Sequence, residues 1–82
     1  MSAPESNLVS SRQLRAARVL AGLSQAGLAR AAGYHANSAK YWEARDDKLP
    51  TTTPSTLPRI EAALRANGVA VFVSSSPGAR II

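Results

Sequence analysis

The side chains that could recognise a ligand gather in a short stretch around residue 40. Asn37 can make a bidentate hydrogen bond to adenine, and Lys40 can reach O6 and N7 of guanine or a phosphate oxygen. Tyr41 can touch a phosphate or a thymine methyl group, and Ala36 can make only an apolar contact with such a methyl group. At i, i+1, i+4 and i+5, the four positions share the outward face of a helix. This pattern predicts a base-reading surface, and the alternative is a solvated polar helix face.

Residue types suited to catalysis or metal binding are scarce in the chain. It has no cysteine and a single histidine, His35, which excludes disulfides, thiolate metal sites and multi-histidine metal sites. As a catalyst His35 would need an oriented partner and a nucleophile, and the sequence offers only scattered serines. Asp46 and Asp47 resemble a carboxylate pair, but between Arg45 and Lys48 they are more typical of a solvated turn. We therefore expect neither an enzyme nor a metal or cofactor site.

Length and charge narrow the class of protein further. Eighty-two residues allow one domain with a small core. Ten Lys and Arg residues stand against five Asp and Glu, a net charge of +5, and a small basic domain most often binds a polyanion such as nucleic acid. The longest apolar run has five residues, 69–73, and residues 1–7 lack the basic and apolar regions of a signal peptide. These features predict a cytoplasmic protein that does not enter a membrane, although positive charge alone also serves solubility.

The first helix is marked by its cap and by a glycine. Residues 1–9 are rich in Ser, Pro and Asn and are expected to form a disordered tail. Ser10 with Gln13 three residues later makes a capping box that begins the helix. Gly22 ends it.

The next two helices are short and closely spaced. Ser24 is the N-cap of a helix expected over residues 25–32, and Gly33 closes that helix. A third helix is expected over roughly residues 35–44, with His35 at its N-cap. Gly33 must adopt positive φ so that the chain can reverse in so few residues. Two short helices joined through one glycine have the spacing of a helix-turn-helix.

A fourth helix follows a loop over residues 46–54. Ser55 or Thr56 caps this helix, and Asn67-Gly68 ends it. Its apolar residues recur at helical spacing, which predicts one buried face. They are Leu57, Ile60, Ala63 and Leu64.

The period of the apolar residues then changes to that of a β-strand. Residues 69–73 are rich in β-branched side chains, residues 74–78 form a turn, and residues 79–82 form a short returning strand. This hairpin is too apolar to stand alone, so pairing with the same strands of a second chain is expected to cover it. The alternative is a hairpin that packs on the first helix of its own chain, with no role in dimerisation. The residues expected at the dimer contact are Val69, Val71, Phe72, Val73 and Ile81.

Several features between residues 23 and 43 occur together at fixed spacing. They are the Ser24-Gln25 opening, Leu28-Ala29, the Ala32-Gly33 turn and the Trp42-Glu43 ending. In this combination the stretch resembles the helix-turn-helix of the Cro/C1-type (XRE) family of transcriptional regulators, over about residues 10–67 of the chain. The resemblance implies a mainly α fold of four helices, here followed by a short C-terminal β-hairpin. Leu28, Ala39 and Trp42 should line the inner seam of the unit.

The resemblance also implies a role for each part of the unit. The third helix would read base edges, and Gln25 at the start of the second helix would donate to a phosphate. Arg18 and Glu43 would form a partly buried ion pair between the first helix and the end of the third. Further phosphate contacts are expected at the rim. They are His35, Ser38, Arg12, Arg15, Arg45 and Lys48.

The resulting expectation is a homodimeric regulator that binds an inverted repeat in double-stranded DNA. Its DNA-binding domain would span residues 10–67, and its dimerisation element would span residues 68–82. The alternative is an antitoxin-type interaction module whose C-terminal strands bind a partner protein such as a toxin. DNA retention that is lost at high salt would favour the regulator, and co-purification with the product of a neighbouring gene would favour the antitoxin.

Overall fold

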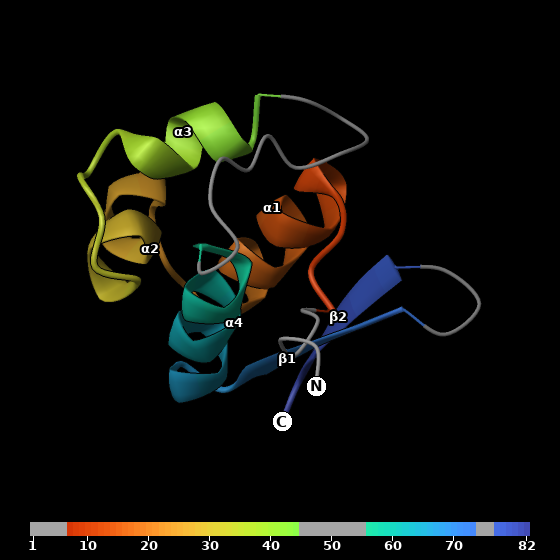
Figure 1. Ribbon diagram of the computed structural model, residues 1–82. Coiled ribbons are helices and arrows are strands. Elements are labelled where there is room, and N and C mark those ends of the chain that lie inside the picture. The colour runs from red at the N-terminus through yellow and green to blue at the C-terminus, as the bar shows by residue number, and fades with distance from the viewer. Residues whose placement is uncertain (1–6, 45–55, 74–76) are drawn as a thin grey trace, which may run out of the picture.

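Four helices followed by a two-stranded antiparallel sheet make up the part of the chain that this computed structural model describes, residues 7–44, 56–73 and 77–82 (Figure 1). The helices are α1 (Ser11–Leu20), α2 (Gln25–Ala31), α3 (Ser38–Trp42) and α4 (Thr56–Ala66), and the strands are β1 (Val69–Val73) and β2 (Pro77–Ile81). The fold is mainly helical, as the sequence predicts. Within the described ranges, no helix is long and apolar enough to span a bilayer.

The boundaries of the first two helices follow from residues that the sequence singles out. The hydroxyl group of Ser10 accepts the backbone N–H of Gln13 at 3.0 Å, and that of Ser24 accepts the N–H of Gly27 at 2.9 Å. Each serine thereby satisfies a backbone donor that has no partner within the helix. Gly33 has a φ of 85° and turns the chain out of α2. The predicted N-caps Ser10 and Ser24 and the predicted turn at Gly33 are confirmed.

The third helix is shorter than the sequence suggests. The segment 35–44 contains a turn and then α3, and the N-cap is Asn37 rather than the predicted His35. Nδ1 of His35 accepts the backbone N–H of Asn37 at 3.2 Å, and the carbonyl group of His35 accepts the N–H of Ser38 at 2.9 Å. Because the imidazole offers the backbone a local acceptor, the chain turns before it becomes helical.

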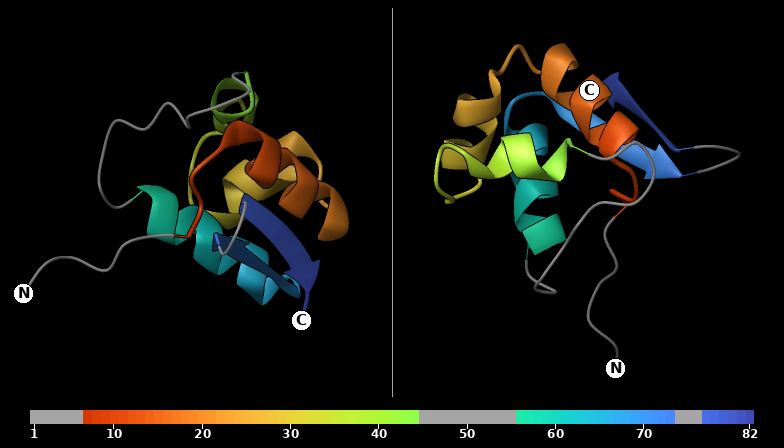
Figure 2. Two further views of the ribbon diagram at one scale, coloured as in Figure 1. Left: turned by 90° about the vertical axis from the view of Figure 1, so that its right-hand side faces the viewer. Right: turned by 90° about the horizontal axis from the view of Figure 1, so that it is seen from above.

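The helices and the sheet share one core, with α2 and α3 at one end of the molecule and the sheet at the other (Figures 1 and 2). α2 contacts both α3 and α4, and the sheet lies against α1 and α4. Leu28, Ala39 and Trp42 are buried, which confirms the predicted seam. Ile60 and Leu64 are fully buried, which confirms the predicted inner face of α4.

The hairpin belongs to this core. β1 and β2 pair from Val69 opposite Ile81 to Val73 opposite Pro77, so β2 begins two residues earlier than predicted. Val69 and Val71 are only 1% and 3% exposed, because α4 packs on β1 and α1 packs on both strands. The prediction that these two valines contact a second chain is therefore wrong. The alternative, a hairpin that packs on the first helix of its own chain, describes their position.

Two of the predicted dimer residues remain exposed on the hairpin. Phe72 is 37% exposed and Ile81 is 68% exposed. The ring of Phe72 lies over Gly78, its partner on β2, where an added Cβ would collide with the ring. Phe72 thus covers the backbone of its own chain, as aromatic residues do opposite strand glycines. Ile81 is the residue of this pair that is more accessible to a partner.

The N-terminal segment is also part of the core, contrary to the tail expected over residues 1–9. Leu8 is fully buried, and the backbone N–H of Asn7 donates to Oε1 of Glu61 at 2.9 Å. Residues 1–6 lie outside the described part of the chain. A single leucine in a polar stretch has no periodic partner in the sequence, so no local pattern indicates its burial.

The side chain of Gln13 joins this segment to the hairpin. Its Oε1 accepts the N–H of Val9 at 2.7 Å, whereas a capping box would use the N–H of Ser10 itself. Its Nε2 donates to the carbonyl group of Asn7 at 2.9 Å, and to those of Phe72 at 2.9 Å and Gly78 at 3.1 Å. Gln13 is 3% exposed, so these bonds satisfy a buried amide group at the meeting point of three chain segments.

Replacing Leu8 by alanine should lower the free energy of unfolding by about 2 to 5 kcal/mol, because it leaves a cavity in the core. Urea denaturation followed by circular dichroism measures this change. Val9→Ala is the matched control, since Val9 is 44% exposed, and it should change stability by less than about 0.5 kcal/mol. If both substitutions change stability equally and only slightly, Leu8 is not part of the core and belongs to a disordered tail.

Candidate nucleic-acid interface

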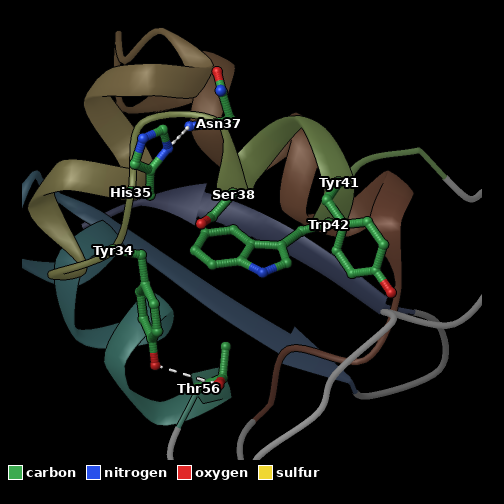
Figure 3. A pocket seen from close by; sticks show the side chains of 7 residues that line it. All are labelled: Tyr34, His35, Asn37, Ser38, Tyr41, Trp42 and Thr56. Carbon is green, nitrogen blue, oxygen red and sulfur yellow. Dashed lines mark hydrogen bonds between the residues drawn. The ribbon is translucent and has the colours of Figure 1, made fainter.

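The unit formed by α2, the turn and α3 carries the four predicted base contacts. Ala36 and Asn37 lie in the turn before α3, and Lys40 and Tyr41 lie on the helix itself. All of them are exposed except Ala36, which is half-buried. The side chain of Asn37 points away from Trp42, which holds α3 in the core (Figure 3). The four residues are close along the chain, but α3 begins after Asn37, so they do not form one regular helix face.

An ion pair ties α1 to the end of α3. Nε of Arg18 lies 2.7 Å from Oε2 of Glu43, and Nη2 of Arg18 lies 3.2 Å from Oε1, a bidentate arrangement. Nη1 of Arg18 donates to the carbonyl group of Leu23 at 3.0 Å, so the same guanidinium group also braces the connection into α2. The side chains of Arg18 and Glu43 are 17% and 3% exposed. The expected ion pair is present, and it faces inward.

Gln25, which is expected to contact a phosphate, has a partner inside the chain. Its Nε2 donates to Oε1 of Glu43 at 3.2 Å, and the residue is half-buried. This bond directs the amide nitrogen of the first residue of α2 toward the ion pair. The two residues are 18 positions apart, so their contact could not be read from a local pattern.

The N-terminal half of α1 supplies donors to the end of α3. The hydroxyl group of Ser11, which is fully buried, donates to the carbonyl oxygen of Trp42 at 2.7 Å. Nη2 of Arg15 donates to the carbonyl oxygen of Glu43 at 3.0 Å. The last carbonyl groups of a helix have no partner within it, and α1 provides partners here. Arg15, a predicted phosphate contact, therefore has a structural bond as well.

The unit and the adjacent α1 are together basic. Between residues 11 and 44, which include α1, five Lys or Arg side chains stand against Glu43 alone. Glu43 is buried and paired with Arg18, so it contributes no negative charge to the surface. The outer surface of this segment therefore has a positive potential that attracts anions.

The remaining predicted phosphate contacts are spread over the unit and beyond it. His35 is exposed in the turn, Arg12 is exposed on α1, and Ser38 is half-buried at the start of α3. Arg45 and Lys48 lie outside the described residues. The structure thus brings His35 and Ser38 next to the base-reading residues, while Arg12 lies on a different helix.

Arg59 and Tyr34 fasten the turn to α4. The ring of Tyr34 meets that of Trp42 edge-on, with centroids 5.4 Å apart, and Cζ of Arg59 lies 4.5 Å from the centroid of Tyr34. Nη2 of Arg59 also donates to the carbonyl group of Gly33 at 3.4 Å, and a Cβ at this glycine would collide with the guanidinium group. Arg59 was not recognised from the sequence, because its partner in the turn is 26 residues away.

A pocket of about 350 Å³ opens beside α3 (Figure 3). Its wall combines three aromatic rings with small polar side chains. The hydroxyl group of Tyr34 donates to Oγ1 of Thr56 at 3.2 Å and links the turn to the start of α4. The lining residues are Tyr34, His35, Asn37, Ser38, Tyr41, Trp42 and Thr56.

Comparisons of this chain with protein-family models, with curated proteins and with solved structures found no match. The likeness to Cro/C1-type regulators therefore remains an expectation from the sequence motif. The geometry and charge of the α2–α3 unit are the grounds on which a function can be argued.

Proposed function

We propose that the protein is a sequence-specific regulator that binds double-stranded DNA through a helix-turn-helix of the Cro/C1 type. The observation that carries the proposal is the exposure of Asn37, Lys40 and Tyr41 on a unit whose inner side is fixed to α1 by an ion pair. Direct readout of bases needs hydrogen-bonding side chains held on a rigid support. The protein performs no chemistry in this proposal and alters transcription by occupying an operator.

Readout and positioning fall to different residues of the unit. Asn37 and Lys40 have the groups that recognise adenine and guanine edges, and Tyr41 contacts a phosphate or a thymine methyl group. Gln25 acts through its bond to Glu43, which sets the start of α2, rather than as a free donor to a phosphate. The positive surface of the unit supplies the part of the affinity that does not depend on sequence.

The regulator acts as a homodimer in this proposal, through a revised contact. Val19 on α1 and Ile81 on β2 are 64% and 68% exposed, and Ile82 beyond β2 is 66% exposed. α1 and β2 contact each other (Figure 2), and the proposal groups these side chains into one surface region, which we call the α1–β2 patch. A second copy that covers this patch about a two-fold axis must hold the two α3 helices about 34 Å apart if both are to enter successive major grooves.

The proposal is tested by selecting preferred sites from random double-stranded DNA and titrating the best site at several salt concentrations. If a dimer neutralises about eight phosphates, log K should fall with log salt with a slope of about −7. The selected sites should be inverted repeats. A slope near zero, or no retention of DNA at low salt, would contradict the proposal.

Alanine variants separate base reading from general attraction. Asn37→Ala or Lys40→Ala should each lose about 1 to 3 kcal/mol of binding free energy on the selected site and relax its base preference. Arg65→Ala is the matched control, because Arg65 is exposed in the last turn of α4, the end that leads into β1. If all three variants keep the same site preference, the recognition surface lies elsewhere.

A further inference from the structure

The pocket beside α3 has the size and the wall of a small-ligand site. At about 350 Å³ it lies near the lower end of the range of small-molecule sites, about 300 to 1,000 Å³. Tyr34 and Trp42 meet edge-on at one side, and Tyr41 stands at the other (Figure 3). Rings on two sides favour a flat, aromatic occupant.

Trp42 aims an unused hydrogen-bond donor into this pocket. The residue as a whole is 5% exposed, and its indole N–H, which keeps access to solvent, has no acceptor in the described part of the chain. In Figure 3 the indole nitrogen faces the space between Tyr34, Thr56 and Tyr41. This donor is free to bind an acceptor that enters the pocket, so it indicates where the acceptor of a ligand would lie.

The charges beside the pocket also favour an acceptor. Nδ1 of His35 accepts the backbone N–H of Asn37, so this nitrogen is already used within the chain. Among the described residues that line the pocket there is no carboxylate, and the guanidinium group of Arg59 lies over the ring of Tyr34, one of the lining side chains. The indole N–H together with this nearby cation matches an anionic occupant.

We propose that the pocket binds a small aromatic carboxylate, with its ring between the aromatic side chains and a carboxylate oxygen accepting from Nε1 of Trp42. We further infer that this ligand releases DNA, an inference that rests on the proposed function. Ser38 and Tyr41 belong both to the pocket wall and to the predicted DNA contacts. A ligand in the pocket would therefore occupy or redirect side chains that the DNA needs.

Binding is measured without DNA, because Trp42 is the only tryptophan of the chain. Benzoate, salicylate and indole-3-carboxylate are titrated against the whole chain, and the indole N–H resonance of Trp42 is followed by NMR together with its fluorescence. We expect a saturable shift with a dissociation constant of about 1 mM or tighter for ligands of this size. Benzyl alcohol and cyclohexanecarboxylate lack the carboxylate and the flat ring, respectively, and should bind at least about tenfold more weakly. No shift with any aromatic acid, or equal shifts with both controls, would overturn the proposal.

A pocket-filling variant ties the signal to this place. Ser38→Leu adds an apolar side chain to the lining and should weaken aromatic-acid binding by at least about tenfold, with the Trp42 signal of a folded protein retained. Ala31→Leu adds the same side chain at an exposed position of α2 outside the lining, and should leave binding unchanged. If Ser38→Leu unfolds the chain, Ser38→Val supplies the test, because it adds a smaller apolar side chain to the same wall of the pocket. Unchanged affinity in the folded variant would place the ligand elsewhere.

The inference that the ligand releases DNA is tested by a separate measurement of DNA affinity. Salicylate at saturation should weaken binding to the selected operator at constant ionic strength, and it should do so less in Ser38→Leu than in Ala31→Leu. Ligand binding with unaltered DNA affinity would overturn the regulatory inference and leave the ligand site in place. Failure to bind DNA in the absence of salicylate would overturn the proposed function, and the NMR titration would still decide the ligand site.

Discussion

Replacement of Glu43 by alanine should lower the free energy of unfolding by about 3 to 5 kcal/mol. The carboxylate group is 3% exposed and receives hydrogen bonds from Arg18 and Gln25. Its removal leaves the guanidinium group of Arg18, which is 17% exposed, without its anionic partner. A domain of this length has a total stability of about 4 to 12 kcal/mol, so the loss would take a large share of it.

Urea unfolding of Glu43→Ala and Glu61→Ala compares the free energy lost when the same carboxylate group is removed from two different positions. Glu61 accepts the backbone N–H of Asn7 and is less buried than Glu43, so its removal should cost less than the removal of Glu43. Arg18→Ala should also lower stability before it alters base preference. If Glu43→Ala or Arg18→Ala leaves the unfolding curve unchanged but abolishes DNA binding, the ion pair contacts DNA and does not stabilise the fold.

Replacing Ile81 by aspartate should reduce affinity for a full inverted-repeat operator by about 100-fold or more. Ile81 is 68% exposed in the α1–β2 patch, so a charge there disrupts an intermolecular contact without entering the core. Each subunit would keep its half-site contacts, but the linkage that makes the second contact intramolecular would be lost. Sedimentation velocity and operator titration of the same preparation measure the two effects.

Val9→Asp is the control for this substitution. Val9 is apolar and 44% exposed, and it lies just before α1, next to the Gln13 bond and outside the α1–β2 patch. It should leave both the sedimentation coefficient and the operator affinity unchanged. If Ile81→Asp still sediments as a dimer and binds as tightly, the dimer contact lies elsewhere. If the unaltered chain is a monomer that co-purifies with another protein, the antitoxin alternative is favoured.

Removing the hairpin would not test the dimer. A chain cut after Gly68 loses Val69 and Val71, which are buried between α1 and α4. It also loses the carbonyl groups that receive the amide of Gln13. Such a chain would change stability and association together, whereas Ile81→Asp changes a side chain on the surface.

Features that depend on neighbouring residues could be predicted from the sequence. Ser10, Ser24 and Gly33 act within one turn of their own position, and the buried face of α4 follows from helical spacing. The first two helices and the first strand were therefore placed to within a residue. The third helix was not, because the imidazole of His35 competes for backbone N–H groups that a helix would otherwise use.

Features that depend on distant contacts could not be predicted. The burial of Leu8 and the placement of Val69 and Val71 depend on how α1, α4 and the sheet close over one another. The pocket needs Tyr34 and Thr56, which are 22 residues apart and meet only in the folded chain. The ion pair was expected because the motif resembles a known family, and neither its two residue types nor their separation would have indicated it.

The three-way bonding of the Gln13 amide has a consequence for the synthesis of the chain. Gln13 joins Asn7 near the start to Phe72 and Gly78 near the end. At about 5 to 20 residues per second, a ribosome needs roughly 4 to 14 s to pass from the first of these positions to the last. Through that interval the core that surrounds Leu8 is incomplete, and the amide group lacks two of its acceptors. A message that stops before codon 78 therefore produces helices without the strands that close them, and we expect such fragments to be degraded by proteases rather than to accumulate as competitors of the complete fold.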